Sequence, residues 1–260
     1  MVNLQKVKHT GLITIPSLFT IGNFACGFFS ILSSINGNYA RAGWLVLIAM
    51  LFDAVDGRVA RILKVESAFG VEMDSLADLI SFCTAPAFLI YFLALKNSTV
   101  LGAPIAFMFM LFGALRLAKF NAMAHAGKGS KQYFSGLPTP AAAAVLVSFA
   151  LSYNIFAFDA NGRLLPGMHL YLPYIYNAVA FITVGLALLM VSNIPYAAFK
   201  GGSRPAAHRK LPIVKLVGIV VVVALFFKYP QDIVFILFGA YAIIGVIMTM
   251  FKAFRNIREK

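Results

Sequence analysis

Acidic side chains are scarce in this chain, and most of them fall in one stretch. The 260 residues include nine Asp and Glu, and six of these lie between Asp53 and Asp78, in a sequence that is otherwise strongly apolar. A carboxylate within a membrane segment is costly in free energy, so such residues usually serve a function. The stretch from Asp53 to Asp78 is therefore the first candidate for a site that performs chemistry.

The four Asp residues of this stretch form two pairs with helical spacing. Asp53 and Asp56 are three residues apart, and Asp74 and Asp78 are four residues apart, so each pair lies on one face of a helix. Four carboxylates at close range repel one another unless cations neutralise them. Hard divalent cations prefer oxygen ligands, and two such ions would balance four negative charges. The spacing thus predicts a site for divalent cations.

Basic and small residues beside the carboxylates extend this chemistry to phosphate. Arg58, Arg61 and Lys64 follow the first Asp pair on the same predicted helix, and Arg is suited to bidentate binding of phosphate. Gly57 and Gly70 lie on the carboxylate faces, where a small residue leaves room for a ligand. Carboxylates, cations and Arg together indicate phosphate-transfer chemistry.

These residues also carry a long and specific motif. The sequence resembles the CDP-alcohol phosphatidyltransferase family, because it matches the family signature without a departure at Asp53, Asp56, Gly57, Ala60, Arg61, Gly70, Asp74 and Asp78. The resemblance implies a membrane enzyme that transfers a phosphatidyl group from a CDP-linked lipid to an alcohol. It also implies a homodimer.

The resemblance assigns a role to each part of the motif. All four Asp residues would bind a divalent cation, Mg²⁺ or Mn²⁺, with two ions per site. Asp78 would also be the catalytic general base. The residues that would contact the CDP-lipid are Gly57, Ala60, Arg61 and Gly70, with Arg61 as a phosphate clamp.

Composition agrees with a membrane location. The chain is 61% hydrophobic and only 12% charged, and its mean hydropathy is +0.86, which is outside the range of soluble globular domains. Apolar runs of about 18 to 25 residues predict an all-α, polytopic transmembrane helix bundle. We expect eight spans, at residues 15–35, 42–61, 74–95, 99–123, 137–157, 171–193, 211–228 and 231–252.

Basic residues define the expected orientation of these spans. With a cytoplasmic N-terminus, eighteen Lys and Arg fall on the cytoplasmic side and four on the other side. This distribution follows the positive-inside rule and predicts that both termini are cytoplasmic. The net charge of +13 then reflects topology and attraction to anionic membrane lipid, and we expect no nucleic-acid partner.

The predicted topology places the site at one end of the bundle. Asp53 lies toward the cytoplasmic end of the second span, at the depth of a lipid diphosphate whose acyl chains remain in the bilayer. We therefore expect a multi-pass protein of the cell membrane with its active site on the cytoplasmic side. The length suits a single membrane domain, 1–260, with catalytic helices in 12–157 and additional spans in 158–260.

Two polar residues of the first span share a face. Thr20 and Asn23 are three residues apart, and the same spacing is also found where polar side chains only join membrane helices. Spacing alone leaves both interpretations open. The family resemblance implies that Thr20 and Asn23 help to hold the cytidine nucleotide. Ser75 could likewise contact the CDP-lipid site or only satisfy its own helix.

The fourth span ends in a second polar group, Arg116, Lys119 and Asn121. Such residues often serve only as anchors on the cytoplasmic side. Arg116 lies inward of the helix end, where a charged side chain is expected to face a cavity and an anion. We therefore expect this group to contact a substrate phosphate or the acceptor's carboxylate.

Softer motifs indicate the acceptor. The sequences IPSLFTIGNFACGFF, GVEMDSLADLISF, RLAKFN and FSGLPTP resemble the serine-using branch of the family, over residues 12 to about 150. This resemblance implies CDP-diacylglycerol and L-serine as substrates. Serine's hydroxyl is a weak nucleophile that needs a base and a good leaving group, and CMP supplies the second.

Two sets of alternatives remain open from the sequence. Within the family the acceptor could instead be glycerol 3-phosphate, inositol or its phosphate, or choline. In another class of protein, a divalent-cation transporter would also hold acidic residues within the membrane. A transporter is expected to place them near the midplane on broken helices, whereas here they lie at one end of the predicted bundle.

Overall fold

The structure is almost entirely helical. The computed structural model describes residues 4–63, 68–97, 100–125, 133–157, 167–197 and 230–258. The helices are α1 Leu4–Ile35, α2 Tyr39–Leu63, α3 Ala68–Asp78, α4 Ala85–Leu93, α5 Gly102–His125, α6 Thr139–Ala157, α7 Met168–Val191 and α9 Pro230–Arg258. A π-helical turn, η1 Leu79–Thr84, joins α3 to α4, and a 3₁₀ turn, η2 Leu95–Asn97, follows α4.

The predicted membrane spans correspond to these helices. Among the described residues, five helical stretches are long and apolar enough to cross a membrane: Leu18–Ile35, Phe69–Leu95, Gly102–Met123, Leu170–Val191 and Asp232–Thr249. The expected spans at 42–61 and 137–157 are also helical, in α2 and α6. The expected span at 211–228 lies outside the described residues, so a polytopic helical membrane fold is established while the number of eight stays a prediction.

The third expected span differs in detail from the sequence-based prediction. Its helix begins at Ala68, several residues before the expected start at Asp74. We also expected a kink at Pro86, and the irregularity is the π-helical turn that ends at Thr84, just before this proline. Proline cannot donate a backbone hydrogen bond, and its ring crowds the preceding helical turn. A π-helical turn is wider than an α-helical turn, so η1 accommodates this crowding. The hydroxyl of Thr84 donates to the carbonyl of Leu79 at 3.0 Å within the turn.

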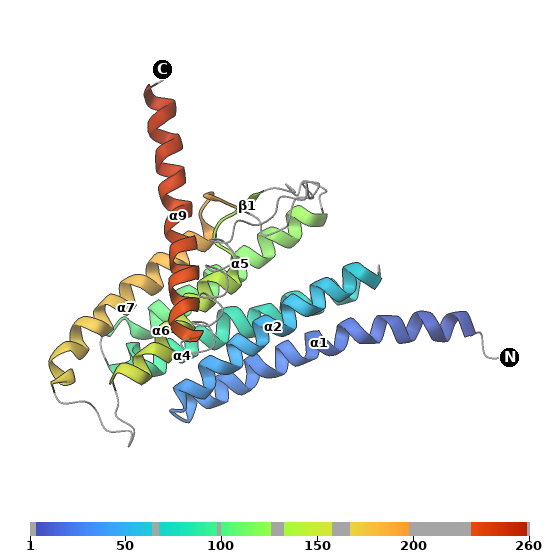
Figure 1. Ribbon diagram of the computed structural model, residues 1–260, viewed down its shortest axis with the longest axis horizontal. Helices are drawn as coiled ribbons and strands as arrows, with labels where there is room; N and C mark the ends of the chain where they lie inside the picture. Colours follow the sequence, from blue (N-terminus) through green and yellow to red (C-terminus); the bar gives the residue numbers. More distant parts are fainter. Residues whose placement is uncertain are drawn as a thin grey trace, which may run out of the picture.

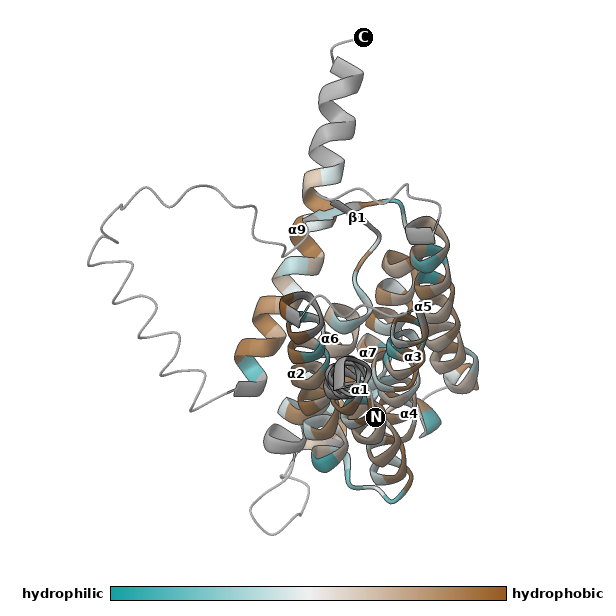
Figure 2. Ribbon diagram, turned by 90° about the vertical axis from the view of Figure 1, so that its right-hand side faces the viewer, coloured by the Kyte–Doolittle hydropathy of each residue, from teal (hydrophilic) through white to brown (hydrophobic). Residues whose placement is uncertain are grey.

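Helix α6 forms the centre of the packed core. Nearly every side chain from Ala141 to Leu151 is buried, and four consecutive Ala residues open this run. Small side chains let neighbouring membrane helices approach closely. On the facing side, a Cβ atom at Gly43 of α2 would lie 2.9 Å from Cγ of Leu151. Large apolar side chains of α1, α5, α7 and α9 remain exposed, as expected where lipid surrounds a bundle. Figure 2 shows hydrophobic residues, in brown, along the helices of the bundle (Figure 2).

A small antiparallel sheet joins distant parts of the chain at one end of the bundle. Strand β1 Tyr133–Ser135 precedes α6, and strand β2 Pro195–Ala197 follows α7. Gly136, directly after β1, has a φ of +85°, a conformation that favours glycine. A Cβ atom there would lie 2.3 Å from the carbonyl oxygen of Met190, so the chain approaches the end of α7 closely.

Helix α9 takes a different direction from the other helices. Figures 1 and 2 both show α1, α2, α5 and α7 running roughly alongside one another, while α9 rises steeply away from them (Figure 1). The first part of α9 is held to the bundle, where the hydroxyl of Ser152 in α6 donates to Oδ1 of Asp232 at 2.7 Å. Its C-terminal end extends beyond the other helices.

Candidate active site

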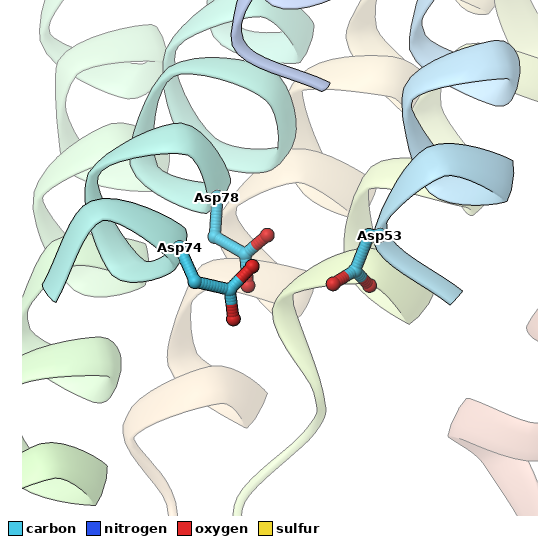
Figure 3. A group of neighbouring side chains, drawn as sticks. All are labelled: Asp53, Asp74 and Asp78. Atoms are coloured by element: carbon cyan, nitrogen blue, oxygen red, sulfur yellow. The ribbon is translucent and has the colours of Figure 1, made fainter. Parts of the chain in front are cut away.

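Three of the four predicted carboxylates meet at one point. Asp53 comes from α2, and Asp74 and Asp78 come from successive turns of α3. One carboxylate oxygen from each residue lies within 4.8 Å of the others, and all three side chains are half-buried. Figure 3 shows Asp74 and Asp78 pointing across the gap between the two helices toward Asp53 (Figure 3). We call these three residues the carboxylate group.

The geometry of the carboxylate group suits a divalent cation. Residues four apart are separated by about 40° around a helix, so Asp74 and Asp78 project side by side toward α2. All donors are hard oxygen atoms, which Mg²⁺ and Mn²⁺ prefer, and their mutual separation is compatible with ligands of one ion. The residues present therefore fit the metal that the sequence predicts.

Asp56 lies beside this group but faces another helix. Residues three apart are separated by about 60° around a helix, so Asp56 is turned from Asp53 toward α1. Its side chain is buried, and its Oδ2 accepts a hydrogen bond from the hydroxyl of Thr20. Asp56 is close enough to Asp53 and Asp74 for their charges to interact. It thus borders the carboxylate group without being one of its three members.

Asn23 brings α1 into direct contact with the site. Its side chain is fully buried, and its Nδ2 donates to Oδ1 of Asp78 at 3.3 Å. Its main-chain carbonyl accepts a hydrogen bond from the hydroxyl of Ser81 at 2.8 Å. Among the described atoms, Oδ1 of Asn23 has no hydrogen-bond partner. The two polar residues predicted on the first span, Thr20 and Asn23, therefore each bind a different site carboxylate.

Among the small residues of the motif, Gly57 has open space around it. Gly57 is exposed, and a Cβ atom built there would meet no atom within 4 Å. Gly70 is half-buried near the start of α3. The backbone of Ala60 and Arg61 continues α2, but their side chains lie outside the described part of the structure.

Ser75 faces Asn121. The hydroxyl of Ser75 donates to the carbonyl of Val71 in its own helix at 3.0 Å, and it accepts a hydrogen bond from Nδ2 of Asn121 at 2.8 Å. Ser75 thus joins α3 to α5. Both hydrogen bonds are local, and a contact of Ser75 with the CDP-lipid stays a prediction.

Arg116 of α5 lies within electrostatic range of Asp78. The guanidinium is half-buried, and Asp78 is within range of its charge. Nη1 donates to the hydroxyl of Thr139 at 3.3 Å, whereas Nε is buried without a hydrogen-bond partner among the described residues. Lys119, one turn further along α5, donates to Oδ1 of Asn193 at 2.9 Å. Of the residues predicted on the fourth span, Arg116 is the one whose charge interacts with Asp78.

Comparison with known proteins agrees with the motif. Residues 13–166 match the family model described as CDP-alcohol phosphatidyltransferase. The chain belongs to the CDP-alcohol phosphatidyltransferase family. A relative from Helicobacter pylori, named CDP-diacylglycerol–serine O-phosphatidyltransferase, is 35% identical over 251 residues, which is 96% of each chain.

Other members of this phosphatidyltransferase family are similar over shorter regions. A protein of the same name from Bacillus subtilis is 35% identical over 72% of this chain and 91% of its own length. An archaetidylserine synthase from Methanothermobacter thermautotrophicus is 37% identical over 77% of this chain and 76% of its own length. The family signature, from Asp53 to Asp78, lies wholly within residues 13–166, which match the family model. The signature contains all three residues of the carboxylate group.

Some residues beside the phosphatidyltransferase site could not be picked out from sequence. Thr139, Asn193 and Tyr241 all lie near Arg116 or Lys119, through hydrogen bonds or within electrostatic range. Thr139 stands in the motif FSGLPTP, which resembles the serine-using branch but does not show that this threonine contacts Arg116. Asn193 and Tyr241 come from beyond the region that the family model matches. No spacing rule connects them to Arg116 in the sequence.

Proposed function

We propose that this protein transfers the phosphatidyl group of CDP-diacylglycerol to the hydroxyl of L-serine, giving phosphatidylserine and CMP. The observation that carries the proposal is the convergence of Asp53, Asp74 and Asp78 in a chain of this family. Several relatives named for this reaction support serine as the acceptor. The reaction takes place at the cytoplasmic side of the cell membrane, in a homodimer of chains with eight spans each.

The carboxylate group and Asp56 would hold the divalent cation. Asp53, Asp74 and Asp78 offer oxygen ligands from two helices, and Asp56 adds a nearby negative charge that could help hold a second ion. When bound there, Mg²⁺ or Mn²⁺ would supply positive charge for the diphosphate of the CDP-lipid and for the leaving oxygen. The hydrogen bond from Thr20 fixes the side chain of Asp56 toward α1.

Asp78 acts as the general base. Its carboxylate takes the proton of the serine hydroxyl as that oxygen attacks the phosphorus atom bearing diacylglycerol. The new oxygen–phosphorus bond forms while the bond to the CMP oxygen breaks, so CMP leaves with the electron pair. Asn23 supports this role, because its donated hydrogen bond orients Asp78 without competing for the proton.

The polar residues around the carboxylates bind the two substrates. Arg61, together with Gly57, Ala60 and Gly70, binds the lipid diphosphate, while Thr20, Asn23 and Ser75 border the CDP-lipid. The acceptor side is formed by Arg116, Lys119 and Asn121. Arg116 receives the serine carboxylate, since a half-buried guanidinium whose Nε has no hydrogen-bond partner among the described residues has a donor to offer an anion.

An acceptor panel tests this proposal. Purified protein in detergent with CDP-diacylglycerol and Mg²⁺ or Mn²⁺ should release CMP when L-serine is added. Glycerol 3-phosphate, inositol, inositol phosphate and choline should each release far less. Release of CMP with one of these and not with serine would contradict the serine assignment. Transport of divalent cations into vesicles without any CMP release would contradict the enzyme assignment.

A further inference from the structure

Thr139 is a buried polar residue directly beside the acceptor side of the site. It is the first residue of α6, its side chain is fully buried, and its hydroxyl accepts the hydrogen bond from Nη1 of Arg116. A guanidinium carries five N–H donors in a fixed planar fork, so one hydrogen bond at Nη1 restricts the direction of the whole fork. Thr139 therefore determines where the remaining donors of Arg116 point.

The position of Thr139 is set by a segment from the other half of the chain. The residues just before it, Gly136 and Leu137, donate backbone hydrogen bonds to the carbonyls of Ile194 at 2.9 Å and Leu189 at 3.0 Å. Strands β1 and β2 pair across the same place. We call the segment 189–197 the support segment, since it holds the chain that leads into α6.

The support segment is itself fixed at two further points. Asn193 accepts the hydrogen bond from Lys119 of α5 at 2.9 Å. Tyr196 is buried, and its hydroxyl donates to the carbonyl of Ala242 at 3.2 Å. Its ring packs closely against Gly245, because a Cβ atom at position 245 would lie 2.1 Å from the ring of Tyr196. Burial and the nearby Tyr241 raise the pKa of Tyr196 to about 12, so the phenol keeps its proton as a donor at neutral pH.

We propose that Thr139 is a positioning residue for acceptor binding, and that the support segment places it. The inference rests on the proposed function, in which Arg116 receives the serine carboxylate. It adds that residues beyond the part matched by the family model, 13–166, determine how the acceptor is bound. The CDP-lipid is bound by α1, α2 and α3, so a change at Thr139 affects the acceptor and leaves the donor largely unaffected.

Steady-state kinetics of the full-length protein in detergent test this inference. Thr139→Val removes the hydroxyl with little change in shape, and we expect the KM for L-serine to rise about tenfold. The KM for CDP-diacylglycerol should stay within about twofold of the wild-type value. Thr139→Ser keeps the hydroxyl, so its KM for L-serine should be close to the wild-type value. If the side chain of Thr139 only filled space, Thr139→Val would be tolerated better than Thr139→Ser.

Two more variants complete the test. Thr183→Val in α7 is a matched control, because Thr183 is also fully buried but donates only to the carbonyl of Val179 in its own helix. It should leave the serine KM unchanged. Asn193→Ala changes an exposed side chain of the support segment and should raise the serine KM about threefold, even if Thr139→Val fails to fold.

The outcomes separate the inference from the function on which it rests. A wild-type protein that releases CMP only with another acceptor would overturn the proposed function. If the wild type uses serine, an unchanged serine KM in Asn193→Ala or in a folded Thr139→Val would overturn the inference alone. An equal rise in both KM values, or a Thr139→Ser variant as impaired as Thr139→Val, would also overturn it.

Discussion

The site carboxylates differ in what surrounds each of them. Asp78 receives a hydrogen bond from Asn23 and lies within range of the Arg116 charge, whereas Asp56 is bound by Thr20 and turned toward α1. Asp53 lies on α2 opposite Asp74 and Asp78, within electrostatic range of Asp56 on the same helix. These surroundings suggest separate tasks, with Asp53 chiefly a metal ligand and Asp78 both a ligand and the base.

Replacing Asp78 tests the base at the level of one residue. Asp78→Asn keeps the shape and the contact with Asn23 but cannot accept the serine proton, so we expect turnover to fall at least about a thousandfold. Binding of CDP-diacylglycerol, measured by equilibrium binding in detergent, should be largely retained. Asp232→Asn, at the start of α9 beside Ser152, is the control and should remain active. An active Asp78→Asn enzyme would rule out this base.

Asp53 offers a test of metal binding. Asp53→Asn removes one negative charge and one strong oxygen ligand, so the Mg²⁺ or Mn²⁺ concentration for half-maximal activity should rise at least about tenfold. Part of the lost activity should return at high metal concentration, which would not happen if Asp53 acted only on the substrate. A variant with the wild-type metal dependence would show that Asp53 is not a ligand.

At the scale of single residues, most of the candidate site could be predicted from the sequence. Charged residues in an apolar chain are few, so the spacing of the two Asp pairs predicted one site of four carboxylates. The structure brings Asp53, Asp74 and Asp78 together and leaves Asp56 beside them. The direction of Asp56 follows from helix geometry only once the position of α1 is known. Thr139 stands in FSGLPTP, one of the motifs that indicate the acceptor, but nothing in the motif connects its side chain to Arg116.

At the scale of elements, the close approach of α1 to the π-helical turn η1 aligns the site. A Cβ atom at Gly27 would lie 2.4 Å from Oγ of Ser81 and 2.9 Å from its Cα. The hydroxyl of Ser81 can therefore reach the carbonyl of Asn23, and the side chain of Asn23 can reach Asp78. The absence of a side chain at position 27 thus helps to set the position of the base.

Gly27→Ala tests this alignment. The new methyl group would clash with the backbone of η1, so α1 must shift, and we expect the unfolding temperature in detergent to fall by several degrees together with turnover. Gly185→Ala in α7 is the control, because a Cβ there meets no atom within 4 Å and alanine favours helix. A fully active and stable Gly27→Ala protein would contradict the role given to this contact.

The elements were predictable to different degrees. Long apolar runs predicted α1, α5 and α7 well, because a membrane span must be both long and apolar. The wider turn η1 has no signature in an apolar run, although Pro86 indicated an irregularity nearby. Strands β1 and β2 are three residues each and pair across a long interval, so no local pattern reveals them.

At the scale of the whole molecule, the two halves of the chain meet at the site. The carboxylate group lies among the first helices, while the support segment and α9 come from the second half. Composition was enough to predict a membrane bundle, but not the direction of α9 or the pairing of β1 with β2. These depend on tertiary contacts such as Tyr196 against Gly245, which join residues far apart in the sequence.

Metal removal tests the site in the intact molecule. Divalent cations bound between α2 and α3 join two helices, so saturating Mg²⁺ or Mn²⁺ should stabilise the folded protein by about 2 to 3 kcal/mol at a hundredfold excess over the dissociation constant. We expect EDTA to abolish CMP release and to lower the unfolding temperature, and added metal to restore both. The temperature shift should be much smaller in Asp53→Asn. Equal shifts in the two proteins would place the metal elsewhere.

The most direct test of the central claim follows both products of one reaction. Wild-type protein is incubated with CDP-diacylglycerol, a divalent cation and labelled L-serine, and CMP release is measured together with label entering the lipid. The account predicts equal amounts of both products, which vanish together with EDTA and in Asp78→Asn. CMP released without label entering the lipid, or label transfer that survives in Asp78→Asn, would contradict it.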